Sequence, residues 1–221
     1  MIYVYDGSFQ GLLTVIFHSY KVLEEVEDIV KSRERYPNKD KIECKTEIDK
    51  ARRVKNSIIK NFSYSFYRNI FMVFSANSGK KEIAIAKTLK KLYVKGFYYI
   101  ESDDEYIALF RKILKKVSEE IKTYKDHLYF DKKEGFLFAK FSPENNILYH
   151  IFNHFKKKFT NTKFIIADTG RNQAVFYDGI RAEFFDYEMQ ENFKIEDNYV
   201  TLWQIFNDVI ASREEKESFW T

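Results

Sequence analysis

The clearest pattern in the chain is an apolar stripe at helical spacing near its beginning. Residues 2–5 are apolar and are followed by the turn pair Asp6-Gly7, which predicts a short strand. Ser8 stands where a helix N-cap is expected, and apolar residues then recur at spacings of three and four over residues 9–20. The opening of the chain therefore predicts a strand, a turn and an amphipathic helix.

The next part of the chain alternates between charged and apolar segments. Residues 24–41 are acidic and then basic, which predicts a solvated connection, and the alternation over residues 42–48 predicts a strand. Asp49 is the expected cap of a helix over residues 50–60. Residues 62–76 are rich in aromatic side chains, which predicts a buried helix of about twelve residues.

Residues 77–79 read Asn-Ser-Gly and break the helical pattern. A helix is expected over residues 80–94, and Gly96 is placed to end it. The break gives the predicted domain boundary. We expect an N-terminal α/β lobe over residues 1–78 and a C-terminal α+β domain over residues 79–221.

The C-terminal half contains two predicted helix starts. Ser102 and Glu105 form a capping box ahead of a helix with one apolar seam, and Ser142-Pro143 is a strong start signal for a second helix. These elements predict an α+β fold in which helices pack on short, mainly antiparallel strands in two lobes. The remaining predicted elements are a hairpin of residues 127–130 with 136–141, strands over 164–167, 173–177 and 180–185, and a final helix over 199–212.

Composition limits the class of protein. Of 221 residues, 45% are hydrophobic and 32% are charged, as in globular proteins, and the net charge is only +4. Phe and Tyr number 22 and 16, which indicates either base-stacking platforms or, as we favour, an aromatic core. The chain has no signal-like start and no apolar run of about 18 residues, so we expect a cytoplasmic protein without a membrane segment.

Common catalytic and metal-binding motifs are missing from the sequence. Cys44 is the single cysteine, and the four histidines are scattered, so neither a disulfide nor a usual structural zinc site is expected. One cysteine also excludes the radical-SAM cluster motif. The sequence has no phosphate-binding P-loop, dinucleotide glycine motif, zincin histidine pair or nucleophile elbow. We therefore expect no cofactor and no metal.

Three groups of polar residues are candidates for chemistry. Asp168 and Arg171 flank a glycine turn, where they form either a site with Arg171 on a phosphate or an ordinary turn with an ion pair. Asp6 is either a catalytic carboxylate after the first strand or a turn residue. His150 and His154 stand four residues apart, but no third metal ligand is identifiable near them.

Basic helix faces are the candidates for nucleic-acid contact. Lysines that line up on one side of a folded chain can follow a phosphate backbone, and neighbouring tyrosines can stack on bases. Each face alone is equally consistent with a solvated helix surface. The candidate residues are Lys87, Lys91, Lys95, Tyr98, Lys112, Lys116, Lys156, Lys157, Lys158 and Arg171.

Two stretches carry family-like motifs, namely YVYDGSFQGLLTVIFHSY and FLFAKFSPENNILYHIFNHFKKKFTNTKFIIADTGRNQAVFYDG. With them the chain resembles an uncharacterised bacterial family labelled as a probable DNA-metabolism protein. The resemblance covers most of the chain. It implies a role in DNA metabolism or repair beside a radical-SAM protein or a uracil-DNA-glycosylase-like domain, and it implies no catalytic residues. The matching residues are Asp6, Gly7, Phe9, His154, Phe155, Phe159, Asp168, Arg171 and Tyr177.

The chain also departs from that family. Residues 122–126 read KTYKD where relatives tend to show HRFKG, and the last residues, ASREEKESFWT, lack the family's basic tail. We expect a non-enzymatic accessory protein that acts with a partner enzyme and touches DNA. One alternative is an enzyme with a polar site around Asp168 and Arg171, on which Asp6 also converges. The other is a protein-interaction module with an exposed apolar patch.

Overall fold

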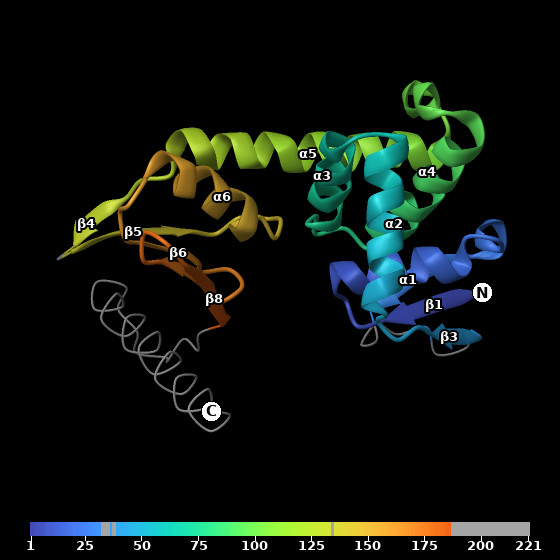
Figure 1. The fold of residues 1–221 in the computed structure, drawn as a ribbon, viewed down its shortest axis with the longest axis horizontal. Helices are drawn as coiled ribbons and strands as arrows, with labels where there is room; N and C mark the ends of the chain where they lie inside the picture. The colour runs from blue at the N-terminus through green and yellow to red at the C-terminus, as the bar shows by residue number, and fades with distance from the viewer. Residues whose placement is uncertain (32–35, 37–38, 134, 187–221) are drawn as a thin grey trace. The chain divides into compact units, whose positions relative to one another are not determined.

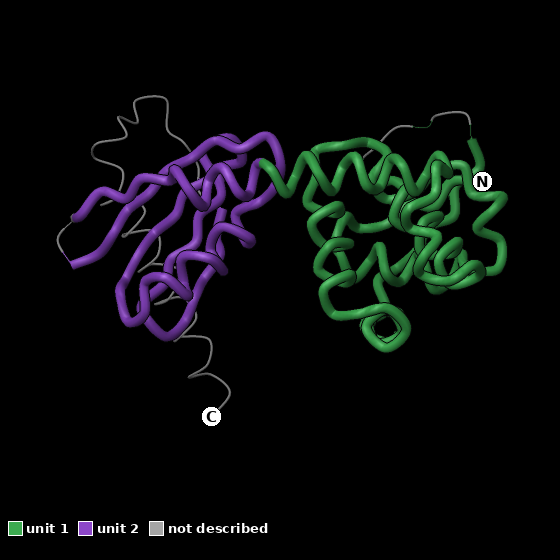
Figure 2. Tube along the Cα trace, turned by 90° about the horizontal axis from the view of Figure 1, so that it is seen from above, with its two compact units in different colours: residues 1–119 green, residues 120–221 purple. Residues whose placement is uncertain are grey.

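The computed structural model describes residues 1–31, 36, 39–133 and 135–186. The predicted final helix over residues 199–212 lies outside this part of the chain. The chain divides into two compact units, residues 1–119 and 120–221, which Figure 2 shows in green and purple. The division falls inside one long helix.

The first unit contains a three-stranded sheet in the order β2-β1-β3, and both strand pairs are parallel. Figure 1 labels β1 and β3. All four residues of β1 are buried, as a central strand requires. The predicted solvated connection over residues 24–41 is wrong, because β2 forms within it, and the predicted strand over 42–48 is limited to β3. The strands are β1 (Ile2–Tyr5), β2 (Asp28–Lys31) and β3 (Lys41–Glu43).

The strand β2 was not predicted because it lies in a stretch rich in charged residues. Asp28 begins this strand and is only 2% exposed. Its carboxylate accepts hydrogen bonds from the Tyr36 hydroxyl at 2.6 Å and from the Lys80 ammonium at 2.7 Å. A buried carboxylate needs such partners, and Tyr36 and Lys80 are both distant from Asp28 in the sequence.

Helices pack against this sheet. The predicted cap at Ser8 is confirmed, because its side chain accepts from the backbone N–H of Gly11 at 2.9 Å. Asp49 is not the cap of the next helix, which begins at Ile48 with Glu47 as N-cap. The helices are α1 (Phe9–Ser19), η1 (Leu23–Glu25), α2 (Ile48–Asn61), α3 (Tyr64–Phe74), α4 (Lys81–Lys95), η2 (Phe97–Glu101) and α5 (Glu105–His127), which continues into the second unit.

The start of α5 also differs from the predicted capping box. Asp104, not Ser102, accepts from the backbone N–H groups of Tyr106 at 3.1 Å and Ile107 at 3.4 Å. The break at residues 77–79 and the helix that ends before Gly96 are confirmed, and Gly96 has a φ of +89°. None of the described helices combines the length and the apolar character that a membrane crossing needs.

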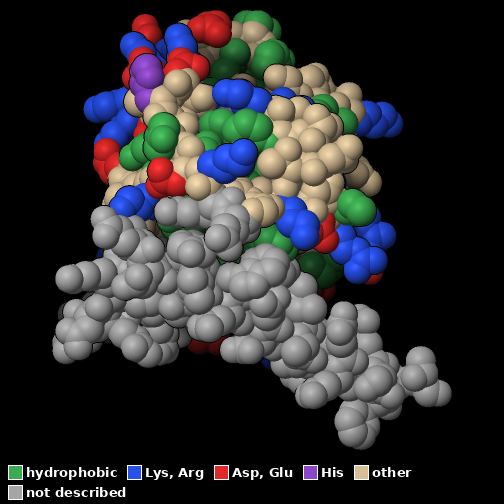
Figure 3. Space-filling model, turned by 90° about the vertical axis from the view of Figure 1, so that its left-hand side faces the viewer, with side chains coloured by type: hydrophobic (Ala, Val, Ile, Leu, Met, Phe, Trp, Pro, Cys, Tyr) green, Lys and Arg blue, Asp and Glu red, His purple; other side chains and the backbone are tan. Residues whose placement is uncertain are grey.

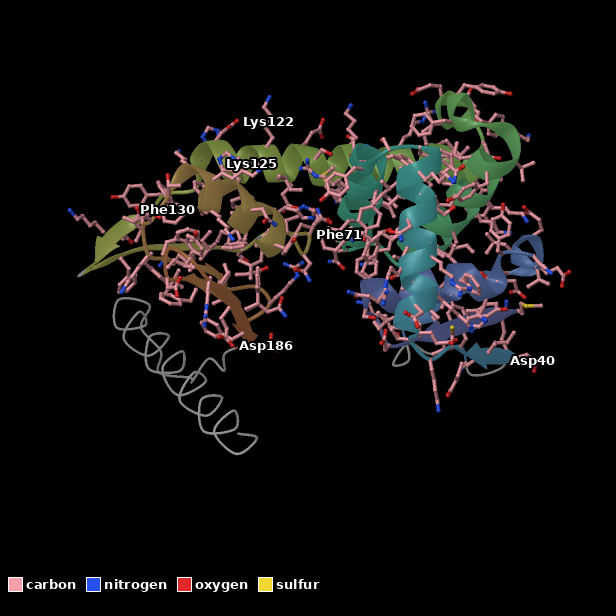
Figure 4. The ribbon with its side chains drawn as sticks, viewed as in Figure 1. Asp40, Phe71, Lys122, Lys125, Phe130 and Asp186 are labelled. Carbon is pink, nitrogen blue, oxygen red and sulfur yellow. The ribbon has the colours of Figure 1, made fainter. Side chains whose placement is uncertain are left out.

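Aromatic side chains build much of the first core. Phe9 of α1 packs against Phe71 and Phe74 of α3, each with ring centroids 5.0 Å away, and Figure 4 labels Phe71 on that helix. Phe66 of α3 packs against Phe62 and against Phe110 of α5. Many of the aromatic residues are thus core residues.

The second unit contains a five-stranded sheet in the order β4-β5-β6-β7-β8. β5 and β6 are parallel, and the other three pairs are antiparallel. The expected α+β class is confirmed, and the expected antiparallel pairing describes this sheet, whereas the sheet of the first unit is parallel. The elements are β4 (Asp131–Lys133), β5 (Phe136–Phe141), α6 (Leu148–Lys158), β6 (Phe164–Asp168), β7 (Gln173–Tyr177) and β8 (Ala182–Asp186).

Helix α6 makes the crossover between the parallel strands and packs on one face of the sheet. Phe152 of α6 contacts Phe164 of β6 and Tyr177 of β7 at centroid distances of 6.0 and 5.9 Å. Phe130, labelled in Figure 4, packs edge-on against Phe155 at 4.7 Å. The predicted strand over 127–130 is wrong, because α5 runs through His127 and β4 uses residues assigned to the turn.

Candidate functional site

The Asp168–Arg171 turn joins β6 to β7 in the second unit. Asp168 is fully buried, and its Oδ1 accepts from the backbone N–H groups of Gly170 at 3.0 Å and Arg171 at 3.2 Å. Its Oδ2 accepts from the Arg171 guanidinium at 3.1 Å. The same guanidinium donates to the backbone carbonyls of Pro143 at 2.9 Å and Glu144 at 2.5 Å. The predicted pair therefore ties the turn to the segment before α6.

Glu120 also binds this segment. It lies in α5, and its carboxylate accepts from the backbone N–H groups of Glu144 at 2.6 Å and Asn145 at 3.1 Å. The Asn145 side chain, 3% exposed, also donates to Glu120 at 2.6 Å. Tyr124, one turn further along α5, donates from its hydroxyl to the Ser142 carbonyl at 3.2 Å.

These contacts explain why α6 starts five residues after the predicted position. A helix that started at Ser142 would turn the N–H groups of residues 144 and 145 towards its own cap. Glu120 accepts hydrogen bonds from those N–H groups instead, and Arg171 donates hydrogen bonds to the carbonyls of Pro143 and Glu144. The segment therefore forms an irregular turn. The helix begins only at Leu148, with Ile147 as its N-cap.

The bonds of the Asp168–Arg171 pair support a structural role. Burial raises the pKa of Asp168, against the lowering effect of the Arg171 charge and the N–H groups of the turn. Both carboxylate oxygens of Asp168 accept hydrogen bonds inside the unit. Both terminal guanidinium nitrogens of Arg171 donate hydrogen bonds inside the unit. Three of the five guanidinium N–H donors of Arg171 make these bonds, so a substrate phosphate would compete with two backbone carbonyls and Asp168 for this side chain.

Asp6 follows β1 at the edge where the parallel strands end. Such edges often bind ligands in α/β proteins. Here Asp6 Oδ1 accepts hydrogen bonds from the Ser8 backbone N–H at 2.9 Å and from the Ser8 hydroxyl at 2.7 Å. Asp6 Oδ2 accepts a hydrogen bond from the Thr46 hydroxyl at 2.7 Å. Partial burial acts to raise the pKa of Asp6, but these hydrogen bonds outweigh it and lower the pKa.

Asp6 belongs to the first unit, whereas Asp168 and Arg171 belong to the second. Asp6 bonds to Ser8 and Thr46 of its own unit, and the Asp168–Arg171 pair bonds within the second unit. A common catalytic site of the three residues therefore stays a prediction.

The structure describes no third metal ligand beside the histidine pair on α6 in residues 1–31, 36, 39–133 and 135–186. Within the described ranges, no group of three or more His, Cys, Asp or Glu side chains is arranged to hold a metal ion. The ring of His154 packs edge-on against Phe155 at 4.9 Å. Burial and the charges of Lys125 and Lys158 lower the pKa of His154.

The structure separates the basic candidates by their surroundings. Lys87 is 4% exposed, and its ammonium donates to the Glu24 carbonyl at 3.1 Å, so it does not form part of an accessible phosphate surface. Lys91 pairs with Asp104 at the start of α5. Lys95 is exposed, and its ammonium lies 4.2 Å from the centre of the Tyr99 ring.

Other basic candidates lie on exposed helix surfaces. Lys112 and Lys116 are exposed on α5, and Lys156 to Lys158 are exposed at the end of α6, as the sequence predicted. Lys156 lies 5.3 Å from the Tyr177 ring centre and Lys158 lies 5.5 Å from that of Phe155. On the face in Figure 3, Lys and Arg side chains lie dispersed between hydrophobic and uncharged atoms, without merging into one basic patch.

The turn between α4 and η2 is the most exposed aromatic surface of the first unit. Val94 is 68%, Phe97 45% and Tyr98 78% exposed. We call residues 94–98 the aromatic turn. Gly96 shapes it, because its positive φ reverses the chain and a Cβ at this position would lie 3.2 Å from the Tyr98 ring. The sequence singled out Lys95 and Tyr98, but the exposure of Val94 was not predicted, since it continues the helical pattern of α4.

Residues 79–218 match the family model of DUF4130, a domain of unknown function. The match covers more than half of the chain. The chain belongs to the DUF4130 family. No curated protein matches it.

The DUF4130 match and the compact units divide the chain differently. The match begins at residue 79, next to the predicted boundary after residue 78, whereas the contacts divide the chain after Glu119. The DUF4130 region therefore includes α4, the aromatic turn and the whole of α5 together with the second unit. The assignment of residues 1–78 and 79–221 as domains stays a prediction.

Proposed function

We propose that the protein binds single-stranded nucleic acid through the aromatic turn and acts as an accessory protein in DNA metabolism. The observation that carries this proposal is the exposed Tyr98 ring beside the exposed Lys95, within the DUF4130 region. The resemblance to a family labelled for DNA metabolism supplies the biological setting. It also supports a radical-SAM or glycosylase-like enzyme as the partner.

The aromatic turn has the chemistry of a stacking platform. Phe97 is anchored by Phe62 and Phe66, with ring centroids at 5.6 and 5.1 Å, so the turn is attached to the core. Tyr98 leaves most of its ring open to solvent. A base that stacks on such a ring gains about 1–3 kcal/mol irrespective of its sequence. Lys95 supplies a charge for the adjacent phosphate.

The two alternative functions have less support. An enzyme centred on Asp168 and Arg171 would need polar groups available to a substrate, and both Asp168 oxygens and three of the five Arg171 N–H donors are bonded within the unit. An interaction module would use the same exposed apolar side chains of the aromatic turn, but without a need for Lys95.

The proposal is tested by fluorescence anisotropy with labelled single-stranded and duplex DNA at two salt concentrations. We expect tighter binding of the single strand, weakened by salt. Tyr98→Ala should weaken it about tenfold, because one stacked base is lost. Lys95→Gln should reduce the salt dependence by about one phosphate contact.

Tyr129→Ala is the matched control, because Tyr129 is 76% exposed and lies outside the aromatic turn. It should leave the affinity unchanged. Absence of binding at low salt would overturn nucleic-acid binding. Equal losses for Tyr98→Ala and Tyr129→Ala would overturn the assignment of the site to the aromatic turn.

A further inference from the structure

A pocket of about 380 Å³ opens between α1, α2 and α4 in the first unit. Its size falls in the range of small-molecule sites, about 300–1,000 Å³. Figure 1 shows α2 crossing α1, and the Tyr93 hydroxyl of α4 donates to Ser57 of α2 at 2.8 Å. The walls are formed by Ile16, Phe17, Tyr20, Val54, Ser57 and Tyr93, and Arg53 completes the lining.

Three of the seven lining side chains are aromatic, and they stay accessible. Phe17 is 37% exposed, and Tyr20 and Tyr93 are half-buried. The rings of Tyr20 and Tyr93 stand edge to face, with centroids 6.1 Å apart and an angle of 80°. Such an arrangement offers both ring faces and ring edges to a flat apolar ligand.

Arg53 gives the pocket a free positive charge. It is exposed, and no hydrogen bond or ion pair is found for it within the described part of the chain. The neighbouring Arg52, in contrast, forms an ion pair with the Asp49 carboxylate at 2.9 Å. Lys50 is held by Glu47 at 2.8 Å, and the Lys90 ammonium lies 4.0 Å from the Tyr20 ring centre. The charges of the pocket therefore favour an anion, and Arg53 is the group open to pair with it.

We propose that this pocket binds a planar aromatic molecule that carries one carboxylate or phosphate group. The ring lies against Phe17, Tyr20 and Tyr93, and the anionic group pairs with Arg53. The site is separate from the aromatic turn, so the inference does not depend on the proposed nucleic-acid binding. It adds a small-molecule site to a part of the chain outside the DUF4130 match, apart from Tyr93.

Calorimetric titration of the full chain with naphthoate, naphthyl phosphate and naphthamide tests the proposal. The three probes share one ring system, and naphthamide lacks the charge. We expect at least one of the two anions to bind about tenfold more tightly than naphthamide, as for a hydrogen bond to a charged group. The better anion identifies the carboxylate or the phosphate as the preferred group.

Two variants locate the site. Arg53→Gln should remove the preference for the anion, while Arg52→Gln, on the same helix, should preserve it. Val54→Trp fills the pocket and should weaken the binding of all three probes about tenfold or more. The proposal is overturned if no probe binds saturably, or if the affinity for naphthamide equals that for each of the two anions. It is also overturned if Arg53→Gln and Arg52→Gln have the same effect on the preference for the anion.

Discussion

Gly11 determines how closely α1 can approach the end of the parallel sheet. A Cβ at this position would lie 2.3 Å from Asp6 Oδ1, 2.8 Å from the Thr46 hydroxyl and 2.9 Å from the Tyr5 ring. Asp6 begins the turn that follows β1, and Thr46 is bonded to it. The missing side chain therefore allows the hydrogen bonds from Ser8 and Thr46 to Asp6 to form.

Gly11→Ala is expected to destabilise the protein, although alanine is normally the better helix residue by about 1 kcal/mol. The forced displacement of Asp6 and Thr46 should cost more than this gain, with a net loss of about 1–3 kcal/mol. Urea denaturation measures the difference. Gly79→Ala is the control, because no atom lies within 4 Å of its added Cβ. Equal stability of the two variants would contradict the close packing at Gly11.

Asp104 is expected to link stability to pH at the start of α5. Partial burial raises its pKa, but the Lys91 ammonium and the N–H groups of Ile107 and Tyr106 outweigh burial and lower it. A lowered pKa in the folded state stabilises the protein above the unfolded pKa of about 3.9, and this contribution is lost as the pH falls through the folded value.

Denaturation of the wild type and Asp104→Asn at pH 7 and pH 3 measures this contribution. Asparagine preserves the cap but not the ion pair, so we expect a difference of about 1 kcal/mol at pH 7 that shrinks towards pH 3. Asp103→Asn should show little difference at either pH, because Asp103 is fully exposed. A difference for Asp104→Asn that is independent of pH would contradict the ion-pair contribution.

At the scale of elements, the segment over residues 142–147 depends on partners from two other elements. Glu120 of α5 accepts its N–H groups, and Arg171 of the β6–β7 turn donates to its carbonyls. The local signal for a helix start at Ser142-Pro143 is strong, but these partners pair the backbone in another geometry. The result is an irregular connection between β5 and α6.

Glu120→Gln should destabilise the second unit by about 1–3 kcal/mol, because an amide nitrogen would face N–H groups that now have an acceptor. Hydrogen exchange should rise at the amides of Glu144 and Asn145. Glu119→Gln is the matched control on the exposed side of α5. Similar stability and exchange in the two variants would show that Glu120 does not hold the segment.

At the scale of the whole molecule, each unit has its own core. In the first unit, Phe66 is 4% exposed and contacts Phe62, Phe97 and Phe110. In the second unit, Phe164 is fully buried against side chains of α6 and β7. Helix α5 contributes residues to both units.

We expect core substitutions to act mainly on their own unit. Phe164→Ala should lower the free energy of unfolding by about 3–5 kcal/mol. It should raise hydrogen exchange in β5 to β7, while the amides of β1 and α1 stay protected. Phe66→Ala should give the reverse pattern. Equal loss of protection in both units for either variant would show that the chain unfolds as one cooperative body.

Local patterns were sufficient for elements whose capping and packing residues are adjacent in the chain. They predicted β1, the Ser8 cap, α3, α4 and β7, since the apolar period and the breakers of these segments are contained within them. They also placed Asp168 and Arg171 in one turn. They did not predict that the Arg171 side chain bonds to residues over twenty positions away.

The sequence by itself determined the α+β class, the aromatic cores and the cations at the end of α6, because these follow from spacing along the chain. The tertiary structure decided the parallel pairing of β1 with β2, the late start of α6, the burial of Lys87 and the pocket beside Arg53. Each of these depends on partners from distant segments, such as Tyr36 and Lys80 at Asp28 or Glu24 at Lys87. Burial and hydrogen bonding between distant segments overrode the local preferences there.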